Sequence, residues 1–333
     1  MNMFSVLSSA PLDGGARTAG WREYLQMARL DHMTKHVFIL PGLVLAMAFR
    51  GVPDQGIWWR VALGFASAVL IASANYIINE WLDRESDAFH PDKSARPAVN
   101  TVMSGPVVYG FYALVSAAGL LMAHAVGPLF LYVSLLFWLS GIVYNVYPFR
   151  TKDMAYLDVL SESINNPLRM LLGWAMVDQS SIAPSSLLLG YWMGGAFLMA
   201  TKRLSEFREI AAGPGVQVLH QYRRSFRQYT AESLTISCFV YALLTIFLMG
   251  VFLIKYRIEY VLALPLVITM FAHYLALAMR TGSVAQKPEK LLREKRLMGI
   301  SSLTIAALAL FTFVDVPPLH GFSEPHFIVI GAR

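Results

Sequence analysis

The sequence predicts an all-α, polytopic membrane protein with nine transmembrane helices. Hydrophobic residues make up 56% of the 333 positions and charged residues only 14%, whereas soluble domains average about 25% charged residues. The apolar residues are grouped in blocks of about 17–24 residues, which is the length of a membrane-spanning helix. A soluble core could not bury this much apolar surface, so a single membrane domain is the simplest reading of the composition.

We divide the chain into an N-terminal cytoplasmic, amphipathic segment (1–32), a transmembrane domain (33–315) and a C-terminal, non-cytoplasmic tail (316–333). The stretch WREYLQMARLDHMTK at 21–35 is typical of an amphipathic helix on a membrane surface, and no cleavable signal peptide is evident before it. The nine predicted spans cover residues 33–50, 57–79, 104–124, 127–147, 156–177, 184–201, 232–254, 258–279 and 297–315.

The fifth predicted span is unusually polar. Asp158, Glu162, Asn165 and Arg169 recur at helical spacing along it. Charged groups inside a membrane are costly, and they commonly line a cavity or a functional pathway. Two interpretations stay open: the charges belong to an active site, or they pair between helices and only hold the bundle together.

The distribution of basic residues predicts the orientation. Most of the 27 Lys and Arg residues fall in the N-terminal segment and in the loops after spans two, four, six and eight. The positive-inside rule places these segments in the cytoplasm, so nine spans put the C-terminus outside an inner, cytoplasmic membrane. The run RRSFRQY at 223–229 is interpreted as part of this basic flank. A nucleic-acid partner is not indicated, because the net charge of +6 is spread over several loops.

An acidic cluster follows the second predicted span. Asn79, Asp83 and Asp87 recur every fourth residue, so on a helix they share one face, with neighbouring Cβ atoms about 5–6 Å apart. Hard oxygen ligands suit Mg²⁺, which typically takes one or two carboxylates and completes its shell with water and substrate phosphate. The face therefore predicts a Mg²⁺ and diphosphate site, and Glu80 and Glu85 point elsewhere. A solvated, acid-rich helix end is the alternative.

This pattern, N-x-x-x-D-x-x-x-D followed by K-x-x-R-P at 93–97, resembles the first motif of the UbiA superfamily of membrane prenyltransferases. The resemblance extends over residues 20–315. Family members usually read N-D-x-x-D-x-x-x-D, so Glu80 is a departure that keeps a carboxylate. The resemblance implies a UbiA-type helical bundle. It also implies a site for Mg²⁺ and the donor diphosphate made of Asn79, Asp83, Asp87, Lys93 and Arg96.

The second half of the sequence indicates a branch of this superfamily. UbiA prenyltransferases typically carry another Asp-rich motif after span six, but this chain reads MATKRLSEFREI there, with Lys202 and Arg203 in place of acids and Glu206 nearby. A basic pair binds phosphate directly, Arg through a planar fork and Lys as a point charge. Together with the YPF sequence and Lys152 of the preceding loop and with Arg169, this segment resembles decaprenyl-phosphate phosphoribosyltransferases.

That branch transfers 5-phosphoribose from phosphoribosyl diphosphate (PRPP) to a polyprenyl phosphate and releases diphosphate. Its product feeds arabinofuranosyl donors for the cell envelope, and a rhizobial nodulation relative linked to arabinosylated Nod factors belongs to it. The resemblance implies that Lys202 and Arg203 bind the 5-phosphate, that Asp158 stabilises an oxocarbenium-like centre, and that either Lys152 or Arg169 seats the acceptor phosphate. Tyr147 and Glu206 complete the candidate substrate-binding residues.

Two other function classes remain as alternatives. The first is an ordinary UbiA prenyltransferase that joins a polyprenyl diphosphate to an aromatic acceptor. The second is a membrane transporter, which should carry paired polar groups near mid-membrane, whereas most polar groups here gather on the cytoplasmic side. A G-x-x-x-G pair at Gly190 and Gly194 predicts close helix packing, within one chain or between the subunits of a homo-oligomer.

Overall fold

The computed structural model describes residues 17–51, 56–90, 93–213, 215–280 and 294–323. The start of the predicted N-terminal segment and the end of the predicted tail lie outside these residues. In the described part of the chain the fold is all-α, as predicted, and an isolated β-bridge between Thr18 and Val102 is its only extended pairing.

The chain forms α-helices connected by short 3₁₀-helices. The α-helices are α1 Trp21–Met27, α2 Leu40–Arg50, α3 Ile57–Asp87, α4 Pro97–Asn100, α5 Gly105–Val126, α6 Pro128–Asn145, α7 Leu157–Ser163, α8 Asn165–Val177, α9 Ser185–Ala212, α10 Val216–Tyr222, α11 Ala231–Tyr256, α12 Leu264–Ala278, α14 Lys295–Phe313 and α15 Pro317–Ser323. The 3₁₀-helices are η1 Leu30–Ile39, η2 Lys93–Ala95, η3 Thr151–Asp153, η4 Arg224–Arg227 and η5 Ile258–Ala263.

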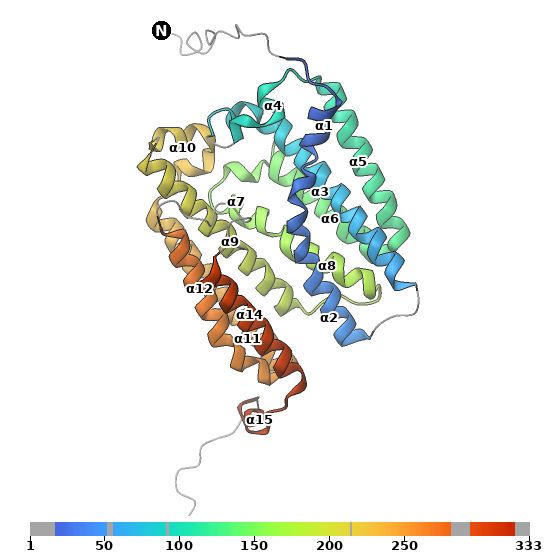
Figure 1. The fold of residues 1–333 in the computed structure, drawn as a ribbon, viewed down its shortest axis with the longest axis vertical. Helices are drawn as coiled ribbons and strands as arrows, with labels where there is room; N and C mark the ends of the chain where they lie inside the picture. Colours follow the sequence, from blue (N-terminus) through green and yellow to red (C-terminus); the bar gives the residue numbers. More distant parts are fainter. Residues whose placement is uncertain (1–16, 52–55, 91–92, 214, 281–293, 324–333) are drawn as a thin grey trace, which may run out of the picture.

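The long helices form a bundle with short elements at its two ends. Figure 1 shows α4 and α10 together at one end and α15 at the other. Apolar side chains of α2, α3, α6 and α8 form the largest core cluster, and α9 and α11 contribute to a second one. The loops after α3 and α9 therefore meet at the same end of the bundle, which is where the candidate site lies.

Among the described residues, six helical segments are long and apolar enough to cross a membrane: 57–87, 105–126, 128–145, 231–256, 258–278 and 295–313. They correspond to six of the nine predicted spans. The exact count of nine is not confirmed. Of the other three predicted spans, 33–50 and 156–177 are each divided between two helices, and 184–201 lies within α9, which continues through the charged segment up to Ala212.

The divided fifth span explains why its hydropathy is poor. The helix stops after Ser163 and restarts at Asn165, and nearly every residue of α8 is buried by other parts of the bundle. Two glycines allow α2 and α8 to approach closely: a Cβ on Gly42 would lie 1.8 Å from the carbonyl oxygen of Met170, and one on Gly173 would lie 2.1 Å from that of Ile39. Residues buried this way face protein and not lipid.

Helix α3 is longer than its predicted span. It continues without a break from Ile57 to Asp87, so its 31 residues extend over about 46 Å. The hydrocarbon core of a bilayer is only about 30 Å thick. The last turns of α3 therefore extend beyond the apolar stretch, and they present Asn79, Asp83 and Asp87 on one helical face as the spacing predicts.

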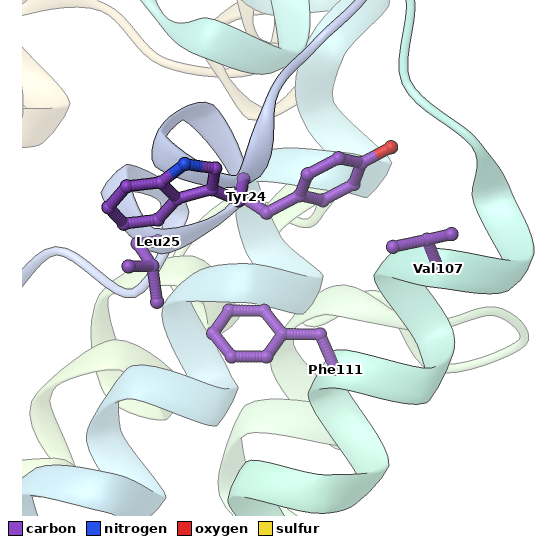
Figure 2. A pocket seen from close by; sticks show the side chains of 5 residues that line it. Tyr24, Leu25, Val107 and Phe111 are labelled. Atoms are coloured by element: carbon purple, nitrogen blue, oxygen red, sulfur yellow. The ribbon is translucent and has the colours of Figure 1, made fainter.

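Two further predictions concern helix packing at the periphery. Gly190 and Gly194 face Met249 and Thr245 of α11, so the G-x-x-x-G pair serves packing within one chain. The predicted amphipathic segment begins with α1, whose residues Trp21, Tyr24 and Leu25 line an apolar pocket of about 300 Å³ against Val107 and Phe111 of α5 (Figure 2). This pocket contains none of the candidate site residues.

Candidate active site

The carboxylates at the end of α3 are both paired with cations. Asp83 lies 2.5 Å from the Lys152 ammonium and 3.0 Å from the Arg150 guanidinium. Asp87 pairs with Arg96 and lies 3.9 Å from Lys93. The structure thus brings the predicted acids together with the predicted basic residues of two different loops.

An asparagine network fixes the membrane side of this cluster. The side-chain oxygen of Asn145, at the end of α6, accepts hydrogen bonds from the amide of Asn79 and, at 2.8 Å, from Lys152. The Asn145 amide in turn donates to the Gly141 carbonyl. Neither Asn145 nor Arg150 was a predicted site residue, because their partners are distant in the sequence.

Glu80 does not share the acidic face. Its side chain is 2% exposed and accepts a hydrogen bond of 3.3 Å from the backbone N–H of Ala98, in the first turn of α4. Glu85 is 87% exposed at its side chain. Both findings agree with the prediction that these two acids lie outside the diphosphate face, so the departure at Glu80 does not change the donor set of that face.

The second half of the site is organised around Arg203. Its guanidinium is 2% exposed and pairs with three carboxylates: Asp158 at 3.3 Å, Glu162 at 2.5 Å and Glu206 at 3.3 Å. Asp158 itself is fully buried. By contrast, the half-buried Lys202 has no ion-pair partner within 4.0 Å among the described residues. Of the predicted phosphate-binding pair, Lys202 is therefore the residue whose charge is available to a ligand.

Part of the segment 223–229 turns into the site, although Arg224 and Arg227 are exposed as expected of a basic flank. Ser225 and Tyr229 donate hydrogen bonds of 3.1 Å and 2.6 Å to Asp158. Arg223 donates a hydrogen bond of 2.6 Å to the hydroxyl of Tyr144. The alternation of basic and aromatic residues in RRSFRQY gave no signal that these side chains turn inward, because their partners lie on other helices.

One contact joins the two halves of the site directly. The Lys93 ammonium lies 2.7 Å from the hydroxyl of Tyr222, and His90 packs edge-on against the same ring. Burial lowers the pKa of Lys93 to about 8, against the opposing effect of Glu206 and Asp87. Burial likewise lowers the pKa of Lys152 to about 8, with Asp83 acting in the opposite direction.

Two predicted residues lie apart from these clusters. Tyr147 is 62% exposed, and its hydroxyl accepts a hydrogen bond of 3.1 Å from Arg224. Arg169 is buried elsewhere in the bundle, with its guanidinium 4.9 Å from the ring centroid of Phe137. The structure therefore does not join Arg169 to the carboxylates of α3 or to those around Arg203.

The predicted metal ligands can be compared with the needs of Mg²⁺. Among the described residues no group of three or more His, Cys, Asp or Glu side chains is placed to hold a metal. Asp83 and Asp87, one helical turn apart, offer two carboxylates, and Asn79 adds an amide oxygen. Mg²⁺ commonly binds through one or two carboxylates and takes its remaining ligands from water and phosphate, so this donor set fits a Mg²⁺ ion whose other ligands are water or phosphate.

The fold and the site define a class of protein: a polytopic helical membrane protein with a cluster of acids and cations at one end of its bundle. The particular family follows from the sequence comparison. The chain belongs to the UbiA prenyltransferase family, whose sequence profile matches residues 37–303. It is thus a membrane transferase, and the predicted superfamily is confirmed.

The chain is similar to relatives with two different activities. The decaprenyl-phosphate phosphoribosyltransferase of Mycolicibacterium smegmatis is 29% identical over 182 residues, which cover 53% of this chain and 52% of the relative. The protoheme IX farnesyltransferase of Geobacillus kaustophilus is 28% identical over 220 residues, 63% of this chain and 69% of the relative. The chain thus matches about half the length of the phosphoribosyltransferase.

The solved structures that resemble this one share its fold. A UbiA homologue from Archaeoglobus fulgidus, bound to DMAPP and Mg²⁺, has a TM-score of 0.64 at 21% identity and covers 88% of this chain and 100% of its own. The same homologue bound to GPP and Mg²⁺ gives 0.64 at 22% identity, covering 87% of this chain and 99% of its own. Identities this low support the fold alone.

Proposed function

We propose that this protein transfers 5-phosphoribose from PRPP to a polyprenyl phosphate at the cytoplasmic face of the membrane and releases diphosphate. The observation that carries the proposal is the replacement of a second acidic motif by Lys202 and Arg203, on a helix that lies across the site from the acids of α3. A donor with phosphate groups at both ends would use both clusters. A prenyl diphosphate has only one phosphorylated end.

The diphosphate of PRPP would bind at the end of α3. Asn79, Asp83 and Asp87 would hold Mg²⁺, which when bound neutralises charge on the leaving diphosphate. Lys93 and Arg96 would contact the phosphate oxygens. Cations placed where negative charge develops stabilise the transition state without reorganisation, and the loops after α3 and α6 supply them here.

The 5-phosphate would bind at the second cluster. Lys202 has the available charge, while Arg203 is engaged by three carboxylates and would hold this part of the site together. Asp158 is fully buried and holds Arg203, Ser225 and Tyr229. In the proposal Asp158 therefore positions Arg203, Ser225 and Tyr229. It would stabilise an oxocarbenium-like centre through its negative charge and not by direct contact.

The chemical step needs no strong general base. The bond between C1 of ribose and the diphosphate oxygen breaks, and the electron pair leaves with the diphosphate. An oxygen of the acceptor phosphate, already anionic, forms the new bond to C1. The site has to hold the two phosphorylated substrates in line, and alignment of this kind contributes strongly to the rate.

The alternative transfer, of a prenyl group to an aromatic acceptor, is favoured by the similarity to protoheme IX farnesyltransferases. It needs one diphosphate site, which α3 would supply. It leaves Lys202 without a ligand, and for that reason we rank it below phosphoribosyl transfer. The use of the product in arabinofuranosyl donor synthesis remains part of the proposal.

A donor exchange on the purified protein tests the proposal. One reaction contains PRPP labelled in the ribose together with a polyprenyl phosphate and Mg²⁺. The other contains labelled polyprenyl diphosphate together with aromatic acceptors. Label from PRPP in the lipid phase supports phosphoribosyl transfer. Transfer only from the prenyl diphosphate would replace it with the alternative.

A further inference from the structure

A second group of basic side chains lies deeper in the bundle than the clusters described above. Arg169 of α8 is only 7% exposed, and its guanidinium lies within electrostatic range of Tyr76 of α3. Its Nε is buried without any hydrogen-bond partner. The guanidinium lies against the face of Phe137, 4.9 Å from the ring centroid.

The neighbouring element η1 adds two more basic residues. The Lys35 ammonium lies 5.3 Å from the ring centroid of Tyr76. His36 is 7% exposed, its Nδ1 is buried without a partner, and it lies within the electrostatic range of Arg169 and Lys35. Tyr76 of α3 thus lies near a cation from each of two other elements.

In the part of the chain that the structure describes, neither Lys35 nor Arg169 forms an ion pair within 4.0 Å, whereas Arg203 and Arg150 each pair with carboxylates. An unpaired buried charge and an unsatisfied buried N–H are both costly. Ionisable residues held at such a cost inside a membrane domain are by default functional, and two orphaned nitrogens beside two cations indicate a missing anion.

The position of this group relates it to the donor site. Tyr76 precedes Asn79 by three residues on α3, so the two side chains lie on the same face, with Tyr76 nearer the middle of the membrane segment. Lys35 also acts electrostatically on Glu162 and Lys202. The group therefore lies beside the proposed donor site, on the side that faces the bilayer interior.

We propose that Lys35, His36 and Arg169 form a second anion site that binds the phosphomonoester head of an isoprenyl lipid. The Nε–H of Arg169 supplies a directed donor, the Nδ1 of His36 supplies a second one in the tautomer that carries its proton there, and Lys35 supplies a mobile charge. The assignment of this lipid as the acceptor rests on the proposed function. It also resolves the choice between Lys152 and Arg169, because Lys152 is already engaged by Asp83 and Asn145.

Binding measurements on the full chain in detergent test this site without requiring turnover. The probes are farnesyl phosphate, farnesol, inorganic phosphate and PRPP with Mg²⁺. The variants are Lys35→Gln and Arg169→Gln, and Lys255→Gln is the matched control because that lysine is exposed on α11. Lys35 is half-buried, so Lys35→Gln keeps the test valid if Arg169→Gln does not fold.

The proposal predicts that farnesyl phosphate binds the wild-type chain and the control equally, and each site variant at least about tenfold more weakly, while PRPP affinity changes less than about twofold. Farnesol should bind all of them alike, because it lacks the anion. Equal binding of farnesyl phosphate to wild type and Lys35→Gln would overturn the proposal. The proposal would also be overturned if the site variants weakened the binding of inorganic phosphate only, because that result would indicate a site for free phosphate. Retained site-dependent binding of farnesyl phosphate without any PRPP turnover would instead reject the proposed function alone.

Discussion

The carboxylate of Asp83, on α3, lies 2.5 Å from the ammonium of Lys152, on η3. This contact connects the end of the second predicted span with the loop after the fourth. Lys152 also donates to Asn145, which accepts from Asn79. The proposed donor site is thus held together by contacts between loops, and its acids are placed before any ligand arrives.

Asp83→Asn and Asp87→Asn should each reduce turnover by at least about 100-fold, because each removes a charge needed for the metal and the leaving diphosphate. The measurement is the rate of lipid labelling from PRPP as Mg²⁺ is varied. The matched control is Glu85→Gln, on the same helix but 87% exposed, which should stay within about twofold of wild type. Wild-type turnover in both aspartate variants would contradict the role of this face.

Arg203→Ala should destabilise the protein, because it leaves Asp158, Glu162 and Glu206 as buried carboxylates without their shared cation. Removing one partner from a buried ion pair costs about 3–5 kcal/mol. Thermal unfolding in detergent measures the loss. Arg208→Ala, on the same helix but exposed, is the control, and an equal effect of both substitutions would show that the three carboxylates do not depend on Arg203.

Affinity for an anionic donor should fall as the pH rises through about 8. Burial lowers the pKa of Lys93 and of Lys152 to about 8, so both are charged below this pH and lose their proton above it. Only the charged form attracts a phosphate, so the dissociation constant of PRPP should rise about tenfold or more between about pH 7 and about pH 9. A combined Lys93→Arg and Lys152→Arg variant should reduce this dependence. A PRPP dissociation constant of the wild type that does not change with pH would contradict this prediction.

Cysteine labelling tests the predicted orientation. The native Cys238 is fully buried, so it should not react with a membrane-impermeant maleimide. Glu85→Cys should be protected in intact cells and react after permeabilisation, because the loop after α3 is predicted to be cytoplasmic. Ile182→Cys, 62% exposed in the loop before α9, should react in intact cells. The reverse labelling pattern would show that the chain has the opposite orientation in the membrane.

The parts of the site that were predicted from the sequence are those that depend on the spacing of neighbouring residues. The four-residue repeat of Asn79, Asp83 and Asp87 determines a helical face whatever packs against it, and α3 has that face. The basic pair after span six is equally visible, because it interrupts a motif of the family. The all-α bundle was also predictable, because amphipathic and apolar blocks are local patterns in the sequence.

The parts that were missed depend on contacts between distant segments. Nothing near Arg150 or Asn145 in the sequence indicates that they meet α3. Arg223 and Tyr229 look like a basic flank until the fold turns them toward Tyr144 and Asp158. The division of the fifth span was also not predicted, because helical periodicity continues across the break between α7 and α8 even though the backbone does not.

The most direct test of the central claim is the release of diphosphate from PRPP labelled in its β-phosphate by the purified protein with Mg²⁺. We predict release that requires a polyprenyl phosphate, is lost in Asp83→Asn and persists in Glu85→Gln. Absence of release with every polyprenyl phosphate, alongside consumption of a polyprenyl diphosphate with an aromatic acceptor, would contradict phosphoribosyl transfer.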